Sequence, residues 1–359
     1  MGTRALLERG AWNIAHAGHD LDTTFQRLDE LLRPHVPYAI ASWSTHDPAT
    51  ALFTSCTMTG IEKNPEGEAA LFRCEFTAGE PASYRSLIGR RHPAAILSEV
   101  TGGDLDLASR YRTIFRPVGF TDELRAVLWS GDTAWGSATL LRFYGRFSAE
   151  DVETVGLIAR HAADGIRLAL LRGAAARPEA VAEPPGIFAV DPTGRVTAVT
   201  SPAEHWLELG RAELITAVTA AAAAIRAQPD WAGASSRLLL GDHAVLAIHA
   251  AAMSRDSDTV AVIVERARPA EVSAMIVDAY GLTRRQRDVL GQLLLGRSMT
   301  QLAHALGISE HTAQDHRKAI YRRTGVGSRS ELAGRLQFEQ YDPRVWSDVP
   351  PSPYGGFLE

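Results

Sequence analysis

The segment 310–324 (EHTAQDHRKAIYRRT) has the kinds of side chain that recognise a nucleic acid. If it forms a helix, the face turned away from a packed core carries Gln314, Asp315, Arg317, Lys318, Arg322 and Arg323. Arginine can bridge the edge of guanine, glutamine can pair with adenine, and lysine or arginine can neutralise a phosphate. A solvated helix on the surface of a helical bundle is often basic as well, so the surrounding elements must decide between the two interpretations.

Helix start and stop signals predict three further helices around this segment. A hydroxyl residue stands at each expected N-cap, at Thr283, Ser298, Ser309 and Ser328. After the first, second and fourth of these, Gln or Glu follows three residues later, which is the pattern of a capping box. Glycines suited to the left-handed end of a helix stand at Gly296, Gly307 and Gly325. We therefore expect four helices, at 283–295, 299–306, 310–324 and 329–338.

The turn between the second and third of these helices is only Gly307-Ile308-Ser309. A short glycine turn of this kind joins the two helices of a helix-turn-helix. Apolar residues recur at helical spacing and would form a small core from Val289, Leu290, Leu293, Leu294, Leu302, Ala303, Leu306, Ile308, Ala313, Ile320, Tyr321, Leu332 and Leu336. The helix 310–324 is then the one expected to read DNA in the major groove.

The charge of the chain is distributed unevenly. The chain has 37 Lys and Arg and 42 Asp and Glu, which gives a net charge of −5. The segment 282–336 alone holds ten basic and four acidic residues, a net charge of +6, which leaves −11 for the rest. An acidic body with a compact basic end is expected when only that end meets a polyanion.

The stretch from Leu282 to Leu332 resembles the LuxR-type helix-turn-helix family. The matching positions are Leu282-Thr283, Val289-Leu290, Gly296, Ala303, Leu306, Ile308-Ser309, Thr312, His316, Ile320, Gly325-Val326 and Ser328-Arg329. The resemblance implies a sequence-specific transcription regulator in which Thr312 and His316 join the six residues above at the DNA. It also implies that the last helix, Ser328 to Phe338, supports a homodimer that reads two half-sites one helical turn apart.

The predicted recognition helix departs from the family pattern at two positions. A valine followed by a basic residue is usual where this chain has Ala313-Gln314, so a phosphate contact is lost. Asp315 would repel phosphate unless it accepts a hydrogen bond from the N4 amino group of cytosine. Two roles are open for His316, which are contact with the DNA backbone or packing against the core one turn before Ile320.

Two stretches rich in proline, alanine or glycine divide the chain, one at Gly173–Gly186 and one from Tyr341 onward. Pro269 marks a weaker boundary. The expected organisation is a first domain at 1–172, a linker at 173–186, a second domain at 187–267, a linker at 268–281, the helix-turn-helix domain at 282–338 and a disordered tail at 339–359.

The first two domains mix helix, strand and hairpin signals, as small α+β sensor units do. The first resembles a GAF domain on VPYAIASWSTHDPAT and on GFTDELRAVLWSGDTAWGSATLLRFYGRFSAEDVETVGLIARHAADGI. The second resembles a degenerate PAS domain on GIFAVDPTGRVTAVTSPAEHWLEL and TVAVIVE. The predicted fold class is multidomain α+β, with GAF-like and PAS-like α+β sensor domains followed by an all-α four-helix LuxR-type helix-turn-helix domain.

The resemblance leaves two functions open for the domains in front. They either sense a small-molecule effector, or they only mediate dimerisation and protein contacts. A ligand pocket could be lined by Trp43, Trp129, Trp135 and Phe143, although the same aromatic residues also suit an ordinary core.

No catalytic, cofactor or metal chemistry is expected. The chain shows no nucleophile–base constellation and no nucleotide-binding G-x-x-x-x-G-K-[ST] motif, so we predict that it is not an enzyme and carries no cofactor. His16 and His19 only superficially have the spacing of a metal site. The two cysteines, Cys56 and Cys74, cannot build a disulfide framework or a four-cysteine zinc site.

The chain is expected to be cytoplasmic. It has no apolar stretch long enough for a signal peptide or a membrane span, so no membrane partner is predicted. The predicted partners are double-stranded DNA, a second copy of the chain, a small-molecule effector and RNA polymerase.

Overall fold

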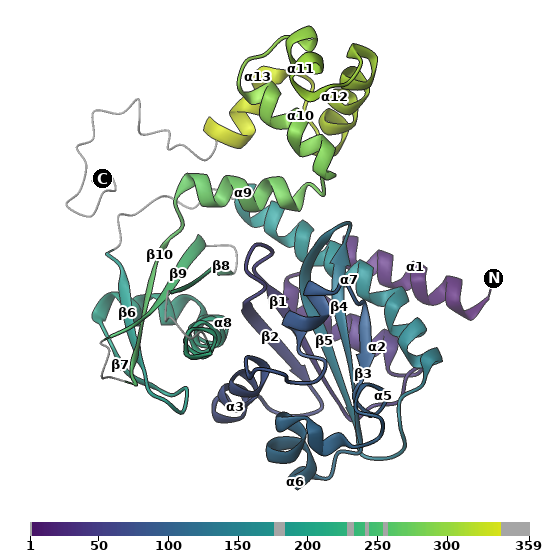
Figure 1. Cartoon of the computed structure of the whole chain (residues 1–359), viewed down its shortest axis with the longest axis vertical. Helices are drawn as coiled ribbons and strands as arrows, with labels where there is room; N and C mark the ends of the chain where they lie inside the picture. Colours follow the sequence, from purple (N-terminus) through teal and green to yellow (C-terminus); the bar gives the residue numbers. More distant parts are fainter. Residues whose placement is uncertain (1, 176–183, 228–232, 241–243, 254–257, 339–359) are drawn as a thin grey trace. The chain divides into compact units, whose positions relative to one another are not determined.

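The computed structural model of the chain describes residues 2–175, 184–227, 233–240, 244–253 and 258–338. They form two compact units, the first ending at Arg266 and the second beginning at Ala267 (Figure 1). The predicted linker at 173–186 falls largely outside the described residues, and the predicted tail at 339–359 does so entirely. Among the described residues, no helix is both long and apolar enough to cross a membrane.

The first unit contains two antiparallel five-stranded sheets. The first sheet has the order β2-β1-β5-β4-β3, with β1 Ile40–His46, β2 Phe53–Thr59, β3 Ala94–Ile96, β4 Asp122–Ser130 and β5 Thr133–Arg142. The second has the order β7-β6-β10-β9-β8, with β6 Gly186–Val190, β7 Val196–Val199, β8 Ala234–Leu240, β9 Ala244–Ala252 and β10 Val260–Arg266. If each set of strands is numbered from its own first strand, the two sheets share the order 2-1-5-4-3.

Helices cover both faces of the first sheet (Figure 1). The helices of this half are α1 Thr3–His16, α2 Leu21–Leu32, α3 Pro65–Glu75, α4 Tyr84–Gly89, α5 Leu97–Val100, α6 Arg116–Val118 and α7 Ala149–Ala175. The long helix α7 packs on β4, and α1 and α2 pack against α7. The predicted α+β class is confirmed.

Helix α8, Ser201–Arg226, lies between the two sheets and explains the alanine-rich middle of the second half. Its residues Ala217 and Ala221 lie in the core of the second sheet, while Ala220 and Ala223 pack with Phe53 of β2. A helix that is buried on opposite faces needs small side chains on both, because each sheet must approach its backbone closely. The alanine run is therefore a packing feature of the first unit.

A buried ion pair also joins the two halves of the first unit. The Asp47 carboxylate, at the end of β1, accepts hydrogen bonds from the Arg237 backbone N–H at 2.6 Å and from its guanidinium at 2.7 and 3.0 Å. Only 1% of the Asp47 side chain is exposed. Charge-assisted, bidentate contacts of this kind fix geometry as well as contributing energy. They therefore fix the position of β8 relative to the first sheet.

Five charged side chains form a buried network beside α3 and β4. Arg110 donates to Glu123 Oε2 at 2.6 and 2.8 Å and to Glu80 Oε1 at 2.8 Å. Arg125 donates to Glu123 Oε1 at 2.8 Å and to Glu75 Oε2 at 2.6 Å. The two guanidinium groups keep the pKa of the Glu123 carboxyl below its usual value in spite of its burial. The charged side chains buried beside α3 and β4 are thus paired with one another.

Several helices were missed by the sequence analysis. Helix α3 begins with Asn64 as its N-cap, accepting from the Glu66 N–H, and with Pro65 at its first position. The segment predicted as a linker at 268–281 contains helix α9, Pro269–Ala279, in which Pro269 is again the first residue. Pro269 was interpreted as a domain boundary, although proline is favoured in the first turn of a helix.

A buried histidine makes the stability of the first unit depend on pH. Burial lowers the pKa of His46 from 6.5 to about 3, and its Nε2 lies 3.0 Å from the Ser137 Oγ. Below pH 6.5 the unfolded chain binds a proton that the folded chain does not. Stability should therefore fall from about pH 6.5 toward pH 3, by up to about 1.4 kcal/mol per pH unit for this one group. Urea unfolding across this range should show a shallower acid dependence for H46Q, whereas an unchanged slope would contradict this role.

Candidate nucleic-acid interface

The second unit is a bundle of short helices with one small core. It contains α9, α10 Arg284–Leu294, α11 Met299–Leu306, α12 Glu310–Thr324, α13 Arg329–Ala333 and a final π-helical turn, Gly334–Phe338. Fully or nearly fully buried core residues come from the four predicted helices, namely Val289, Leu290, Leu293, Leu302, Ala303, Ala313, Ile320, Leu332 and Leu336. Leu294, Leu306, Ile308 and Tyr321, also predicted for the core, are half-buried.

The predicted helix caps are present in all but one detail. Thr283 and Ser298 form capping boxes with Gln286 and Gln301. Ser309 Oγ accepts a hydrogen bond from the Thr312 backbone N–H at 3.0 Å. Ser328 caps the last helix, but its partner Glu331 accepts from the Gly327 backbone N–H instead of completing the box. The helix starts are therefore set by local sequence, which is why they could be predicted.

Helix α12 follows a tight turn and presents a polar face. Gly307 ends α11 in the left-handed conformation, with φ at 63° and ψ at 40°. Ala313, Ile320 and Thr324 bury one side of α12. The opposite side is exposed and carries His311, Gln314, Asp315, Lys318 and Arg322 at spacings of three and four residues. Because one side of α12 is buried in the domain core and the opposite side is exposed, the exposed side can enter a groove of DNA.

Arg317 lies at the margin of this exposed face. Its guanidinium sits 6.0 Å from the centre of the Tyr321 ring, and its side chain is half-buried. Cation–π contact of this kind orients an arginine without consuming its hydrogen-bond donors. The Arg317 N–H groups are thus positioned and still able to bond a base edge or a phosphate.

Several polar residues of α12 have partners that the sequence did not predict. His311 Nδ1 lies 3.3 Å from the Asp315 carboxylate, one turn along the helix, so protonated His311 would pair with it. His311 was missed because it is not a family position, although its spacing to Asp315 could have indicated the contact. The Arg323 guanidinium donates to the Gly281 carbonyl oxygen, which ties the end of α12 to the start of the domain. Thr312 is exposed, and its hydroxyl lies 2.8 Å from Ser309 Oγ.

The segment that contains this helix matches a known family. Residues 281–335 match the model of the luxR family of bacterial regulatory proteins, GerE. This segment is a LuxR-type helix-turn-helix domain. A transcriptional regulatory protein, MctR, of Rhizobium johnstonii is 41% identical over 51 residues, which are 14% of this chain and 24% of that protein. A protein classed as an HTH-type transcriptional regulator, from Aeromonas salmonicida, is 47% identical over 51 residues, 14% of this chain and 26% of that protein. The chain thus spans about a quarter of each of these relatives.

Solved structures that align with this chain include a GAF domain and a bacteriophytochrome. The GAF domain of a phosphoenolpyruvate-protein phosphotransferase from Coxiella burnetii aligns with a TM-score of 0.35 at 16% identity, over 48% of this chain and 96% of that one. A bacteriophytochrome, RpBphP3, from R. palustris aligns with a TM-score of 0.33 at 10% identity, over 73% of this chain and 62% of that one.

Within the LuxR-type domain, the last helix is partly covered by α9. The Ser273 hydroxyl of α9 donates to the Leu336 carbonyl oxygen at 2.7 Å, and Met275 and Ile276 of α9 are buried. The predicted dimer helix, Ser328 to Phe338, therefore packs against a helix that the sequence analysis had assigned to a linker. His316, for which two roles were open, is half-buried.

The four aromatic residues predicted for a ligand pocket do not surround one cavity. Trp43 is fully buried and stacks on Phe25 of α2, with ring centroids 5.9 Å apart. Trp129 packs on the core beside Ala134, and Trp135 follows Ala134 on β5 and so points to the opposite face of the sheet. Phe143 is partly exposed and stacks on Phe120 at 4.5 Å.

Substituting Gly307 by alanine should destabilise the LuxR-type domain by about 1 kcal/mol. Alanine is strained in the left-handed backbone conformation that Gly307 adopts, whereas glycine is not. An added Cβ would meet no atom within 4 Å. Gly291 of α10 offers a matched control, since it is helical and its Cβ would also meet nothing. G291A should stabilise the same domain by about 0.5–1 kcal/mol. Amide hydrogen exchange of α11 and α12 in the full chain measures the stability change in each variant. If G307A and G291A changed the stability equally and in the same direction, the left-handed turn at Gly307 would be contradicted.

Proposed function

We propose that the chain is a transcription regulator that binds double-stranded DNA by placing α12 in the major groove. The exposed face of α12 carries the proposal, because it combines donors for base edges with cations for phosphate on a helix that follows a helix-turn-helix turn. We assign Thr312, Gln314, Asp315, His316, Arg317, Lys318 and Arg322 to the DNA-facing side, and place Arg323, whose guanidinium also donates to the Gly281 carbonyl oxygen, at its end.

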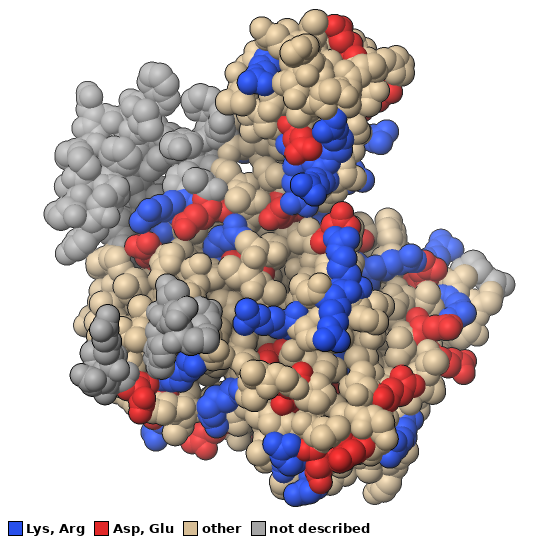
Figure 2. Space-filling view, in the orientation of Figure 1, with Lys and Arg blue, Asp and Glu red and all other residues tan. Residues whose placement is uncertain are grey.

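The distribution of charge supports this assignment. The segment 282–336 carries +6 in a chain whose remaining residues sum to −11. On the face of the first unit that Figure 2 shows, acidic and basic side chains are interspersed, without a broad basic surface. A polyanion would accordingly be attracted to the LuxR-type domain.

A titration of the full chain with duplex DNA of mixed sequence tests DNA binding without knowledge of the operator. The association constant should fall linearly with salt on logarithmic axes, with a slope of about −3 or steeper if three or more phosphates are neutralised. Absence of binding at low salt, or binding that does not change with salt, would contradict the proposal.

The first unit is proposed to modulate this binding as a sensor. Its two sheets of equal strand order are joined through α8 and the Asp47–Arg237 pair, so a ligand that changed one half would act on the other. A dimerisation role without ligand is the second candidate, because the charged side chains buried beside α3 and β4 are already paired with one another. The molecular mass of the full chain in solution, measured with and without DNA, tests whether it forms the proposed homodimer. No catalytic role is proposed.

A further inference from the structure

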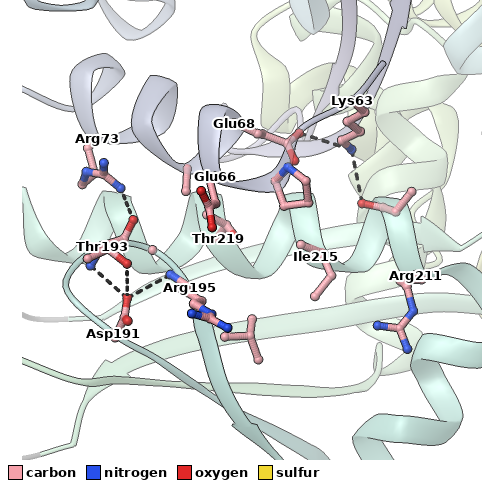
Figure 3. A pocket seen from close by; sticks show the side chains of 15 residues that line it. Lys63, Glu66, Glu68, Arg73, Asp191, Thr193, Arg195, Arg211, Ile215 and Thr219 are labelled. Atoms are coloured by element: carbon pink, nitrogen blue, oxygen red, sulfur yellow. Dashed lines mark hydrogen bonds and ion pairs between the residues drawn. The ribbon is translucent and has the colours of Figure 1, made fainter. Parts of the chain in front are cut away.

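A pocket of about 900 Å³ lies within the first unit, where its two halves meet (Figure 3). One wall comes from α3 and the residues before it, and the other from the β6–β7 turn and α8. The volume is in the range of pockets that bind small molecules. None of the four aromatic residues considered above lines it.

Specific contacts hold the two walls together. The Arg73 guanidinium of α3 donates to the Thr193 carbonyl oxygen of the β6–β7 turn. On the other side, Lys63 Nζ donates to the Thr216 hydroxyl of α8 at 2.6 Å. Gly194 stands so near Ala69 that a Cβ there would lie 2.8 Å from the alanine Cβ. The shape of the pocket therefore depends on how the two halves pack.

The lining is apolar between these contacts. Pro65 and Ala69 contribute from the α3 wall, and Val196 and Ile215 from the β7 and α8 wall. Such a surface releases water when the apolar body of a ligand covers it. The pocket is thus suited to a ligand with an apolar body, and not only to a hydrated inorganic ion.

Three carboxylates line the pocket, the exposed Glu66 and two that already have partners, Asp191 and Glu68, whereas two arginines of the lining have none. Asp191 accepts from the Thr193 hydroxyl and from two backbone N–H groups of its own turn, which lower its pKa. Glu68 lies 3.3 Å from Lys63 Nζ. Within the described part of the chain, the guanidinium groups of Arg195 and Arg211 make no ion pair or hydrogen bond, and Figure 3 shows both at the pocket. These are the cations left for a ligand.

We propose that this pocket binds a small organic anion with an apolar body. Arg195 and Arg211 hold the anionic group, because guanidinium donors bond carboxylates and phosphates with fixed geometry. Ile215 and Val196 cover the apolar body from one wall, and Pro65 and Ala69 cover it from the α3 wall. The ligand touches both halves of the first unit, so it stabilises one packing of them, and this deepens the proposed function by naming the class of effector.

Isothermal titration of the full chain with octanoate tests this site, with octanamide and acetate as probes that lack either the charge or the apolar body. Octanoate should bind once per chain and raise the melting temperature. Octanamide, acetate, and octanoate with the R195Q/R211Q variant should each bind at least about tenfold more weakly. A212W, which fills the pocket from an exposed position on α8, should also abolish binding.

A matched control is R27Q/R85Q, which removes two exposed arginines of the first unit from α2 and α4. It should bind octanoate as the unmodified chain does. No binding of octanoate, or equal binding by R195Q/R211Q, would overturn the inference. The salt-dependent DNA titration on the same preparations keeps the two proposals apart, since a chain that binds DNA but not octanoate refutes only the pocket.

Discussion

Replacing Arg317 and Lys318 together by alanine should weaken DNA binding by about 100-fold or more without unfolding the chain. Each contact of an arginine or lysine with a base edge or phosphate contributes on the order of 1–3 kcal/mol, and the two residues are neighbours on the exposed side of α12. Fluorescence anisotropy with labelled duplex measures the loss, and circular dichroism shows whether the helices are kept. The single variant K318A, at an exposed position, should retain the fold and bind DNA roughly tenfold more weakly.

The control for this prediction removes the same charge elsewhere. Arg27 and Arg85 are exposed on the first unit, so R27A/R85A changes the net charge equally but touches no residue of the LuxR-type domain. Binding should remain within about twofold of the unmodified chain, because neither arginine belongs to the domain that carries α12. Equal losses in the two double variants would show that total charge, and not α12, governs binding.

Replacing Arg110 by alanine should destabilise the first unit by about 3–5 kcal/mol. The Arg110 guanidinium is fully buried and pairs with Glu80 and Glu123, so its removal leaves Glu80 without a cation and Glu123 with only Arg125. Urea unfolding followed by tryptophan fluorescence measures the change. The signal reports chiefly on the first unit, because the segment 282–336 contains no tryptophan.

The matched control is an exposed ion pair of the same half. Arg116 lies 2.7 Å from Asp106, and their side chains are 58% and 45% exposed. R116A should cost less than about 1 kcal/mol, since solvent screens such pairs and they restrict two mobile side chains. If R110A cost no more than R116A, the buried network would not be a determinant of stability in this unit.

The sequence predicted the LuxR-type domain almost completely, for a local reason. Its helix ends are set by caps and glycines whose partners are three or four residues away, as at Thr283 and Gly307. Its core follows from helical spacing. Only α9 was missed, because Pro269 was read as a break and not as the first residue of a helix.

The first unit was predicted in its α+β class but not in its sites. The β6–β7 turn and α3 lie more than 100 residues apart in the chain, so the contact of Arg73 with Thr193 had no local signal. The buried charged side chains likewise had no local signal in the sequence. Nothing in the sequence distinguishes Arg110, which is fully buried, from an exposed arginine such as Arg116, and only tertiary packing shows that it is paired.

The most direct test of DNA recognition by α12 is selection of bound sequences from a pool of random DNA duplexes, with the full chain and the R317A/K318A variant in parallel. The unmodified chain should enrich a roughly palindromic sequence with two half-sites whose centres are about one helical turn apart. The variant should enrich no such sequence. If the unmodified chain enriches none, or if both chains enrich the same one, the assignment of α12 as the recognition helix is contradicted.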